Sequence, residues 1–407
     1  MKDMPDSIVV GGGPVGSFAA LNLAKLGVKV TVFEEHEEIG FPTHCTGHLS
    51  IRSLQNLGLY PLPGKIVENT FSQANFYSPT GFKFSVRLAK PVTCAVNRAA
   101  FDKHISAKAE ATGARYCLNS RVQSLLIENG VVKGVNVKQE DKAERVPAKI
   151  VVDAEGIASR LLRQTGSSGL NSKKLVYAVE AEVENVKDVT LDAVEVFLGK
   201  NYAPGFYAWL MPRLDGTAKV GLATNTGNPK EFLQRLMHKH LVASKQLANA
   251  KIRRIAFHPI TLGGPISKAY SDGFLAVGDV ASQVKPTTGG GVVFGLTCAR
   301  IAAEVANEAI RRNDVSSNFL QLYQKRCTGT LEFDFDVMLR IRRFLDSLSD
   351  KKVDEVLRFC ARIGLDKTLE NVEEIDFQGQ ALLRILTKPA MFAALAYFLK
   401  LYLSANP

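Results

Sequence analysis

The stretch SIVVGGGPVGSFAALNLAKLGVKVTVFEE, residues 7–35, decides the fold of this chain. Its first apolar run is typical of a buried parallel strand, and the motif G-x-G-x-x-G follows that run directly. Pro14 suits the first turn of a helix, because its missing N–H would be unpaired there anyway. Gly27 suits the end of that helix, and a second apolar run leads to Glu34. The stretch therefore predicts a strand–helix–strand unit.

Each part of this unit has a role in binding a dinucleotide. The motif glycines, Gly11, Gly13 and Gly16, allow a tight turn and a close approach of the backbone to a pyrophosphate. The helix N-terminus attracts that pyrophosphate. Glu34 stands about twenty residues beyond the motif, where an acid accepts hydrogen bonds from ribose hydroxyls and disfavours a 2′-phosphate. We therefore expect a site for FAD or NAD.

A second glycine-rich segment, FLAVGDVASQVKPTTGGGVVFGL, covers residues 274–296. Its apolar run predicts a strand that ends near Asp279, whose carboxylate either binds sugar or ribityl hydroxyls or caps the next turn. The run of Gly289, Gly290 and Gly291 predicts exposed backbone N–H groups at the start of a long helix. Because a helix N-terminus is electropositive, this segment suits the negative charge of a reduced flavin ring.

The composition of the 407-residue chain sets broad limits. Hydrophobic residues make up 46% and charged residues 22%, which is typical of a globular protein of two or three domains. The formal net charge of +11 indicates attraction to anionic partners such as phospholipid headgroups. No arginine-rich tract carries interleaved aromatic residues, so we expect no nucleic-acid partner.

The sequence also limits the location and the metal content of the protein. The residues before the first strand are few and polar, and no apolar run approaches the ~20 residues that span a bilayer. The six cysteines lack the spacing of a zinc site or of a secreted disulfide framework. Cys298 and Cys327, predicted on successive helices, form either a pair or two free thiols. We expect a cytoplasmic protein without a metal site.

The hydrophobic pattern changes along the chain and predicts a mixed α/β fold. The predicted dinucleotide-binding domain is discontinuous and comprises residues 1–65, 91–165 and 263–314. Period-two alternation predicts an antiparallel substrate-binding domain, and helical periodicity predicts a C-terminal helical region. These comprise residues 66–90 and 166–262, and residues 315–407, respectively. Within the antiparallel domain, residues 229–248 predict a helix.

Together these segments resemble the para-hydroxybenzoate-hydroxylase group of FAD-containing proteins, and within it the geranylgeranyl reductase family. The narrower resemblance depends on EIGFPTHCTGHLS around Cys45, PGFYAWLMP at 204–212 and PTTGGG at 286–291. Glu155 departs from the pattern, because flavin hydroxylases usually have the aspartate of a D-G pair there. Thr46 likewise replaces a glycine that is frequent in the family.

The resemblance implies a Rossmann-type FAD-binding domain of the glutathione-reductase type, with an antiparallel substrate domain and a helical C-terminal region. It implies that Arg98 binds a flavin phosphate or holds a loop, and that Val15 and Val122 offer backbone contacts. The complete set of predicted FAD-binding residues is Gly11, Gly13, Val15, Gly16, Glu34, Cys45, Thr46, Gly47, Arg98, Val122, Asp279, Gly289, Gly290, Gly291 and Val292.

The resemblance also implies the saturation of prenyl double bonds, in geranylgeranyl chains of membrane lipids or their precursors. An isolated alkene offers no polar handle, so it must be positioned against flavin N5 in a dry pocket. Pro204, Tyr207 and Trp209 are the predicted substrate-binding residues, unless they are ordinary core residues. Cys45 is a proton donor, a redox group or a packing residue.

The sequence also leads to expectations about the electron donor and the substrate. No second G-x-G-x-x-G follows, so the electron donor is NAD(P)H that docks transiently, a reduced ferredoxin or another donor. We expect a monomer that acts on a prenyl lipid. A related FAD monooxygenase or halogenase and an electron-transferring, quinone-linked flavoprotein remain alternatives of the same fold.

The C-terminal stretch TKPAMFAALAYFLKLYLSANP, residues 387–407, is apolar but too short to span a bilayer. Phe392, Leu395, Leu399 and Tyr402 share one helical face at spacings of three and four. Such a helix either lies in the membrane interface, at the inner face of the membrane, or closes the substrate domain as a core helix.

Overall fold

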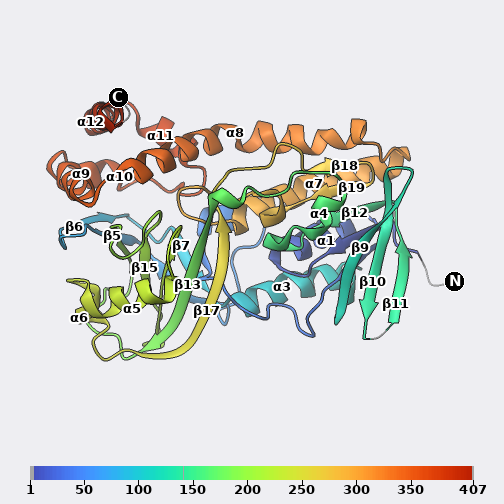
Figure 1. Cartoon of the computed structure of the whole chain (residues 1–407), viewed down its shortest axis with the longest axis horizontal. Coiled ribbons are helices and arrows are strands. Elements are labelled where there is room, and N and C mark those ends of the chain that lie inside the picture. Colours follow the sequence, from blue (N-terminus) through green and yellow to red (C-terminus); the bar gives the residue numbers. More distant parts are fainter. Residues whose placement is uncertain (1–3, 141, 406–407) are drawn as a thin grey trace. The chain divides into compact units, whose positions relative to one another are not determined.

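The computed structural model describes residues 4–140 and 142–405, with side chains up to residue 401. Its backbone divides into two units, each assembled from separated segments (Figure 1). The first unit comprises Met1–Thr43, Arg98–Lys174 and Thr261–Glu332, and the second comprises His44–Asn97, Leu175–Ile260 and Phe333–Pro407. This division differs from the sequence-based boundaries. Residues 44–65 and 91–97 belong to the second unit, residues 166–174 and 261–262 belong to the first, and the predicted C-terminal region 315–407 is split after Glu332.

The central sheet of the first unit has the strand order β18-β19-β12-β1-β2-β8. Its strands are β1 (Ser7–Val10), β2 (Val30–Phe33), β8 (Arg115–Cys117), β12 (Ile150–Asp153), β18 (Tyr270–Ser271) and β19 (Phe274–Ala276). From β19 to β8 the neighbouring strands run parallel, and β18 joins the edge antiparallel. The predicted strand–helix–strand unit and parallel sheet are confirmed. β1 and β12 are buried along their whole length, which agrees with their apolar residues 8–10 and 150–152.

The remaining elements of the first unit surround this sheet. They are the helices α1 (Pro14–Lys25), α3 (Arg98–Ala111), α4 (Arg160–Gln164) and α7 (Val292–Arg312), the 3₁₀ turns η1 (Gly156–Ala158), η2 (Ser172–Lys174) and η3 (Gly278–Ala281), and the antiparallel strands β9 (Ser120–Glu128), β10 (Val131–Gln139) and β11 (Lys142–Pro147). The pair Asn129-Gly130, a sequence typical of hairpin turns, joins β9 to β10, and both residues have positive φ. Helix α8 (Ser317–Ser347) begins in this unit and ends in the second.

The large sheet of the second unit has the strand order β17-β13-β16-β15-β14-β5-β6. Its strands are β5 (Gln73–Tyr77), β6 (Lys83–Arg87), β13 (Leu175–Glu184), β14 (Ala193–Phe197), β15 (Ala208–Pro212), β16 (Ala218–Thr224) and β17 (Lys251–Thr261). A smaller sheet holds β3 (His48–Ser50), β7 (Thr93–Val96) and β4 (Val67–Phe71), and α2 (Ile51–Asn56) follows β3. The large sheet is mainly antiparallel, as predicted, with a parallel pair between β14 and β5.

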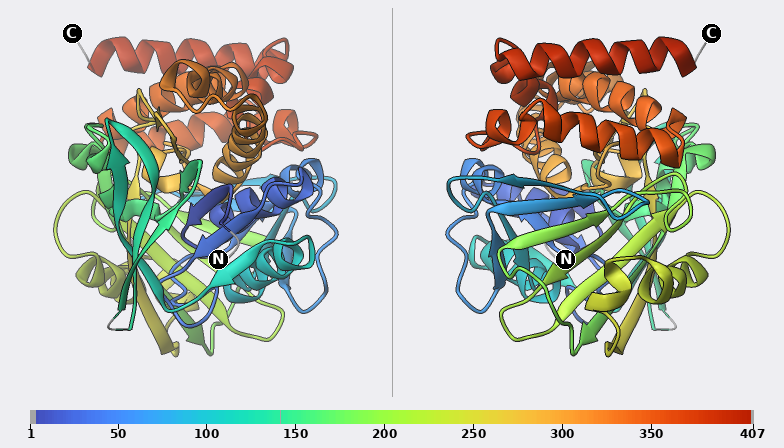
Figure 2. Two further views of the ribbon diagram at one scale, coloured as in Figure 1. Left: turned by 90° about the vertical axis from the view of Figure 1, so that its right-hand side faces the viewer. Right: turned by 90° about the vertical axis from the view of Figure 1, so that its left-hand side faces the viewer.

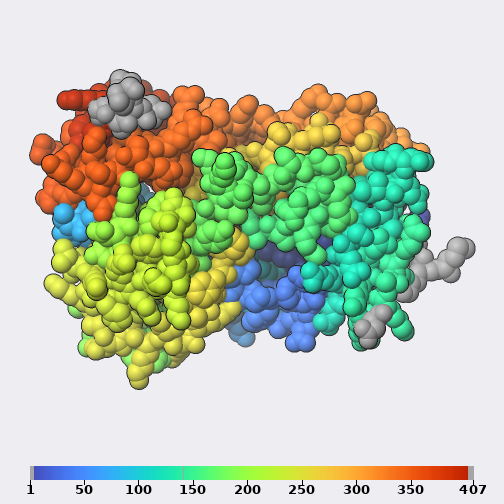
Figure 3. Space-filling view, in the orientation of Figure 1, coloured from blue at the N-terminus to red at the C-terminus, as the bar shows by residue number. Residues whose placement is uncertain are grey.

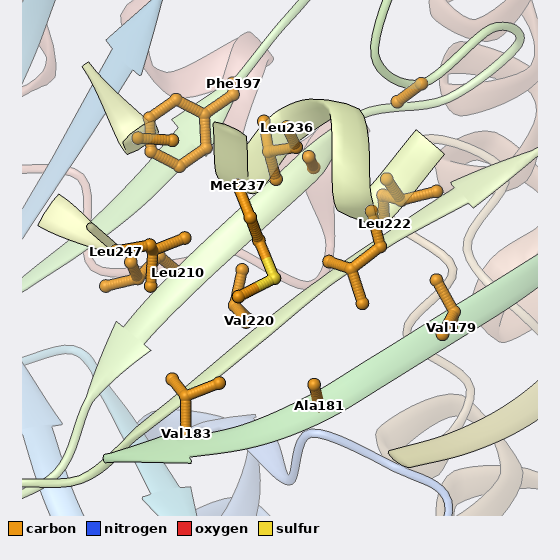
Figure 4. Close-up of a cluster of buried hydrophobic side chains, with 14 of the residues drawn as sticks. Val179, Ala181, Val183, Phe197, Leu210, Val220, Leu222, Leu236, Met237 and Leu247 are labelled. Carbon is orange, nitrogen blue, oxygen red and sulfur yellow. The ribbon is translucent and has the colours of Figure 1, made fainter. Parts of the chain in front are cut away.

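The two faces of the large sheet are covered by different helices (Figure 2). One face packs under α5 (Pro229–Lys239) and α6 (Ala243–Gln246), with Leu210, Val220 and Met237 in its core (Figure 4). At the β6 end of the other face, Phe84 packs against the C-terminal helices. These are α9 (Asp350–Arg362), α10 (Leu365–Leu369), α11 (Gln378–Ile385) and α12 (Pro389–Ala405).

Two further expectations are settled by the helices of the second unit. The single helix predicted at 229–248 is wrong, because the chain breaks at His240 between α5 and α6. The C-terminal region is helical, as predicted. None of the described helices combines the length and the mean hydropathy needed to cross a bilayer.

Candidate cofactor and substrate sites

The motif glycines at the end of β1 have different surroundings. Gly11 has φ +95°, and a Cβ there would lie 2.5 Å from the carbonyl oxygen of Ala154. A Cβ on Gly16 would overlap the carbonyl oxygen of Gly11. A Cβ on Gly13, by contrast, would meet no described atom within 4 Å. Two glycines thus allow tight packing, while Gly13 leaves open space beside the N-terminus of α1, where a pyrophosphate is expected to bind.

Glu34, at the end of β2, is held beside this turn. Its Oε2 accepts a hydrogen bond of 2.7 Å from the Gly12 N–H, and its Oε1 accepts one of 3.0 Å from the His36 N–H. The imidazole Nδ1 of His36 lies 2.6 Å from the same Oε1. The Glu34 side chain is only 12% exposed. The carboxylate predicted to accept from ribose hydroxyls is therefore fixed in position.

The second glycine-rich segment brings Asp279 against the N-terminus of α7. A Cβ on Gly291 would lie 2.7 Å from Asp279 Oδ1, so a side chain at Gly291 would displace the carboxylate. Gly291 is the N-cap residue of α7 and has no side-chain cap, and the first turn, which begins at Val292, holds no acid. Burial raises the pKa of Asp279, and the positive charge of Arg98 opposes this rise. Gly289 has φ +70°, and Gly290 packs against the Lys285 side chain.

Arg98 begins α3 and forms a bidentate ion pair with Asp102. Its Nε and Nη2 donate hydrogen bonds of 3.1 and 3.0 Å to the carboxylate. Burial raises the pKa of Asp102, and the charge of Arg98 opposes the rise. The loop after β2 packs on the start of α3, because a Cβ on Gly40 would lie 2.7 Å from Ala99 Cα.

Two valines predicted to offer backbone contacts also belong to the first unit. A Cβ on Gly295 would lie 2.6 Å from Val15 Cγ2, so α7 approaches α1 closely at this pair. Val122 lies in β9, opposite Val137 of β10. The start of β9 lies next to the end of β2, because the Ser120 N–H donates a hydrogen bond of 2.8 Å to the Glu34 carbonyl. The first unit therefore gathers its predicted FAD-binding residues around the carboxyl ends of β1, β2 and β19.

Glu155, the departure noted in the sequence, is engaged within its own segment. Its Oε1 accepts a hydrogen bond of 2.6 Å from the Leu161 N–H, and its Oε2 lies 3.4 Å from Arg160 Nε. Asp153, at the end of β12, is fully buried, and sequence reasoning missed it. Burial and the nearby charge of Glu155 raise the pKa of the Asp153 carboxyl well above its ordinary value. From the sequence alone, a single aspartate at the end of a strand cannot be recognised as buried, because aspartate is equally common in exposed turns.

Cys45, Thr46 and Gly47 belong to the second unit. Gly47 has φ +74°, and its carbonyl accepts a hydrogen bond of 2.9 Å from the Val96 N–H. The Thr46 hydroxyl donates to the Glu180 carboxylate, and Lys219 Nζ donates 2.8 Å to the Thr46 carbonyl. Because Glu180 and Lys219 lie on neighbouring strands, this loop is fixed to the large sheet. Cys45 itself is half-buried and has a free thiol.

The predicted substrate residues lie at the start of β15. Tyr207 stacks on Phe206 at a centroid distance of 4.4 Å and meets the Trp209 ring edge-on at 5.9 Å. Burial raises the pKa of Tyr207, and the charge of Arg342 opposes this. The Pro204 carbonyl accepts a hydrogen bond of 3.0 Å from the Asn225 N–H. Tyr207 and Trp209 thus form a half-buried aromatic pair.

The structure adds charged residues that the sequence pattern did not indicate. Lys219 is 3% exposed, within a strand that is buried along its length, and its Nζ lies 3.0 Å from Glu68 Oε2. Glu180 alternates with Glu182 and Glu184, which is the pattern of a solvent-facing strand. The one sequence feature that could have indicated this cluster is the single lysine in the apolar run AKVGLAT.

No three His, Cys, Asp or Glu side chains among the described residues cluster as a metal site would require. Cys298 and Cys327 are buried and free.

The glycine turn, the fixed acid and the uncapped helix start fit a flavin dinucleotide, and comparisons with known proteins agree. Residues 4–327 match the family model described as an FAD binding domain. Digeranylgeranylglycerophospholipid reductase 2 of Methanopyrus kandleri is 31% identical over 401 residues, which is 97% of this chain and 99% of that one. The protein of the same name from Methanothermobacter thermautotrophicus is 32% identical over 389 residues, covering 94% and 96%.

Two solved structures resemble this chain over nearly its whole length. A geranylgeranyl bacteriochlorophyll reductase-like protein from Thermoplasma acidophilum has a TM-score of 0.86 at 26% identity, covering 98% of this chain and 99% of that one. A myxobacterial chondrochloren halogenase has a TM-score of 0.70 at 20% identity, covering 96% and 97%, and shares the fold alone. FAD is the cofactor, and the chain belongs to the digeranylgeranylglycerophospholipid reductase family of FAD-binding proteins.

Proposed function

We propose that this protein is an FAD-dependent reductase that saturates the double bonds of geranylgeranyl chains in membrane lipids or their precursors. The observation that carries the proposal within the structure is an apolar row across the large sheet of the second unit. Trp209 pairs with Val196, Val196 with Phe76, and Phe76 with Phe84. Opposite residues of neighbouring strands point to the same face. The row therefore supplies a surface suited to an isoprenoid chain.

The dimensions of this row fit a chain rather than a compact substrate. The row crosses β15, β14, β5 and β6, which at about 4.8 Å per strand spans roughly 14 Å. The members of the row are half-buried or buried, and Phe84 continues into the apolar cluster under α9–α12. A double bond without polar groups is oriented by such contacts and by the exclusion of water.

The residues of the first unit have a separate part in this function. Bound FAD supplies the hydride, from N5 of its reduced ring. Gly13 and Glu34 are proposed to bind the pyrophosphate and the ribose, and the N-terminus of α7 at Gly291 to stabilise negative charge on the reduced ring. Tyr207 and Trp209 are proposed to orient the prenyl chain.

The test is an anaerobic incubation of the dithionite-reduced protein with a digeranylgeranylglycerol phospholipid. We expect the lipid to gain two hydrogen atoms for each saturated bond, measured by mass spectrometry. Oxidised protein without a reductant is the control. Reduced flavin that leaves the lipid unchanged, but halogenates or hydroxylates an aromatic substrate in air, would contradict the proposal in favour of the halogenase or monooxygenase alternative. NAD(P)H and reduced ferredoxin, tested in place of dithionite, identify the electron donor.

The structure also supports contact with a membrane surface through α12. Met391 and Ala394 of this helix are buried in the apolar cluster of the C-terminal helices. On its other face Phe392, Leu395 and Leu399 are 62%, 38% and 59% exposed. The side chain of Tyr402, predicted on the same face, lies outside the described side chains. We therefore propose that α12 is a core helix on one side and a lipid-contacting helix on the other.

A further inference from the structure

Saturation of a double bond needs a proton as well as a hydride, and the second unit holds an acid that no motif indicated. Glu180 of β13 lies opposite Gly221 of β16, and Gly221 lies opposite Trp209 of β15. All three positions face the same side of the sheet. A Cβ on Gly221 would lie 2.5 Å from the Trp209 ring, so the indole covers the glycine. The missing side chain at Gly221 therefore leaves the Glu180 carboxyl beside the Trp209 ring.

The surroundings of Glu180 differ from those of neighbouring carboxylates on the same face. Glu182 accepts a hydrogen bond of 3.1 Å from Arg213 Nη2, and Glu184 accepts one of 2.6 Å from Arg253 Nε. Each of these acids therefore has an arginine as its hydrogen-bond partner. Glu180 instead accepts its hydrogen bond from a neutral group, the Thr46 hydroxyl.

The burial of Glu180 also favours a bound proton. Burial raises the pKa of Glu180, while the Lys219 charge, the Thr46 hydroxyl and the nearby Trp209 N–H oppose the rise. Lys219 is already engaged by Glu68 at 3.0 Å and by the Thr46 carbonyl at 2.8 Å. The Trp209 Nε1 is buried without a hydrogen-bond partner among the described residues, so a polar group of this aromatic pair is left unsatisfied next to the acid.

We propose that Glu180 is the acid that protonates the prenyl double bond, and that Trp209 stabilises the positive charge that develops on the alkene. This role rests on the proposed function. The π electrons of the alkene form a C–H bond to the proton at the less substituted carbon, and the O–H electron pair stays on Glu180 as a carboxylate. The tertiary carbon receives the hydride that reduced FAD supplies, so the alkene gains two electrons and the flavin loses two. Water then returns a proton to Glu180.

The chemistry of an isolated alkene makes this pairing of groups reasonable. A tertiary carbon bears positive charge better than a secondary one, which sets the direction of proton addition. The face of an indole attracts a cation more strongly than other aromatic rings do. Cys45 is the competing proton donor, since it is adjacent to Thr46 in the same loop.

The test compares Glu180→Gln with a matched control, Glu184→Gln, on the same strand and the same face. Both variants are reduced with dithionite, mixed anaerobically with the geranylgeranyl phospholipid, and followed by flavin reoxidation and by mass spectrometry. We expect Glu180→Gln to lower the single-turnover rate about 10²–10⁴-fold. Its FAD content, melting temperature and rate of reoxidation by oxygen are expected to stay at the wild-type values, and the control is expected to match wild type throughout.

The pH dependence gives an independent readout. The acid must be protonated to act, so the single-turnover rate of the wild type falls as the pH rises through the Glu180 pKa. We expect this alkaline decrease to be absent in Glu180→Gln. An infrared pH titration of lipid-free protein should likewise lose one protonated-carboxyl band in that variant. Glu180→Asp keeps the acid but shortens its reach, so it is expected to recover part of the rate and to retain the pH dependence.

The outcomes separate this inference from the proposed function. If the wild type saturates the lipid and Glu180→Gln does so at the same rate, Glu180 is not the donor. If Cys45→Ala alone abolishes the alkaline decrease, the thiol supplies the proton instead. A wild type that leaves the lipid unchanged, while Glu180→Gln still loses the infrared band, contradicts the proposed function and with it the donor role.

Discussion

Substitutions of the motif glycines after β1 are expected to affect stability and FAD binding differently. Ala at position 13 adds a methyl group in open space, on a backbone with φ −61° that any residue adopts. We expect Gly13→Ala to leave the stability of the FAD-free protein unchanged but to weaken FAD binding at least about tenfold, because the methyl group blocks the pyrophosphate. Flavin fluorescence titration and thermal unfolding measure the two effects.

Gly16→Ala is the matched control for that substitution. Its methyl group overlaps the carbonyl oxygen of Gly11, so it should destabilise the FAD-free protein by about 1–3 kcal/mol. Equal stability losses in the two variants would contradict the assignment of open space to Gly13.

Glu34 gives a second prediction at the scale of one residue. Glu34→Ala removes a charged acceptor for the ribose, a loss of about 1.5–3 kcal/mol, which corresponds to roughly 10–100-fold in FAD affinity. FMN lacks the adenosine, so its binding should change much less. Glu34→Gln keeps an oxygen that accepts from the Gly12 N–H, and it controls for distortion of the turn. Equal losses for FAD and FMN would show that Glu34 acts through the turn alone.

Single residues also mark the limit of sequence reasoning. The positions of Glu34, Asp279 and Gly291 could be predicted, because a strand end, a glycine run and a helix start constrain each other along a short stretch. Glu180 could not, because residues 180, 182 and 184 alternate like a solvent face. Its partners, Thr46 and Trp209, come from distant segments that only the folded sheet brings together.

At the scale of elements, the break between α5 and α6 depends on His240. Its Nδ1 accepts hydrogen bonds of 3.2 and 3.1 Å from the Val242 and Ala243 N–H groups, and the ring is fully buried. A helical pattern over 229–248 gave no sign of this, since the break satisfies backbone groups through a side chain that packs in the core. The ring must be neutral to accept these bonds, so burial lowers the pKa of His240 to about 4.

This lowered pKa predicts a loss of stability in mild acid. The unfolded chain binds the proton near pH 6.5 and the folded chain only near pH 4, so stability is complete above 6.5 and falls as the pH decreases toward 4. The loss from this group is at most about 3 kcal/mol. Urea unfolding at pH 7 and pH 5 measures it. His240→Asn keeps an acceptor without a titrating proton, and an unchanged pH dependence in this variant would rule out His240 as the source.

At the scale of the whole molecule, the alternation of segments was predictable but their borders were not. The apolar and period-two patterns separated a parallel from an antiparallel sheet correctly, because each sheet imposes its own period on the sequence. Residues 44–65 carried no such period. They belong to the second unit because β3 pairs with β7, where Leu49 lies opposite Cys94. That pairing joins segments far apart in the sequence.

The exposed face of α12 predicts how the protein meets a lipid surface. The C-terminal helices form a continuous part of the surface in Figure 3. Replacing Phe392 and Leu399 by Ser should weaken co-sedimentation with anionic liposomes at least about tenfold, because two exposed apolar side chains are lost. High salt should weaken binding further, given the net charge of +11. Leu214→Ser, at a side chain that is 70% exposed outside α12, is the control.

Two results would contradict this docking. Wild-type protein that stays in the supernatant with anionic liposomes at low salt would exclude a lipid-contacting surface. A double variant that sediments as well as the wild type would assign the binding to a surface other than α12.

The order of strands in the first sheet has a consequence for biosynthesis. β1 is synthesised well before its partners in this sheet, because its neighbour β12 ends at Asp153, and β19, which pairs with β12, ends at Ala276. At about 5–20 residues per second, roughly 13–50 s pass between the synthesis of the first strand and that of β19. During this time the apolar edges of β1 and β2 have no complete sheet to join. The nascent chain is therefore expected to need chaperones until β19 has been made, and shortened chains that end before β19 should aggregate.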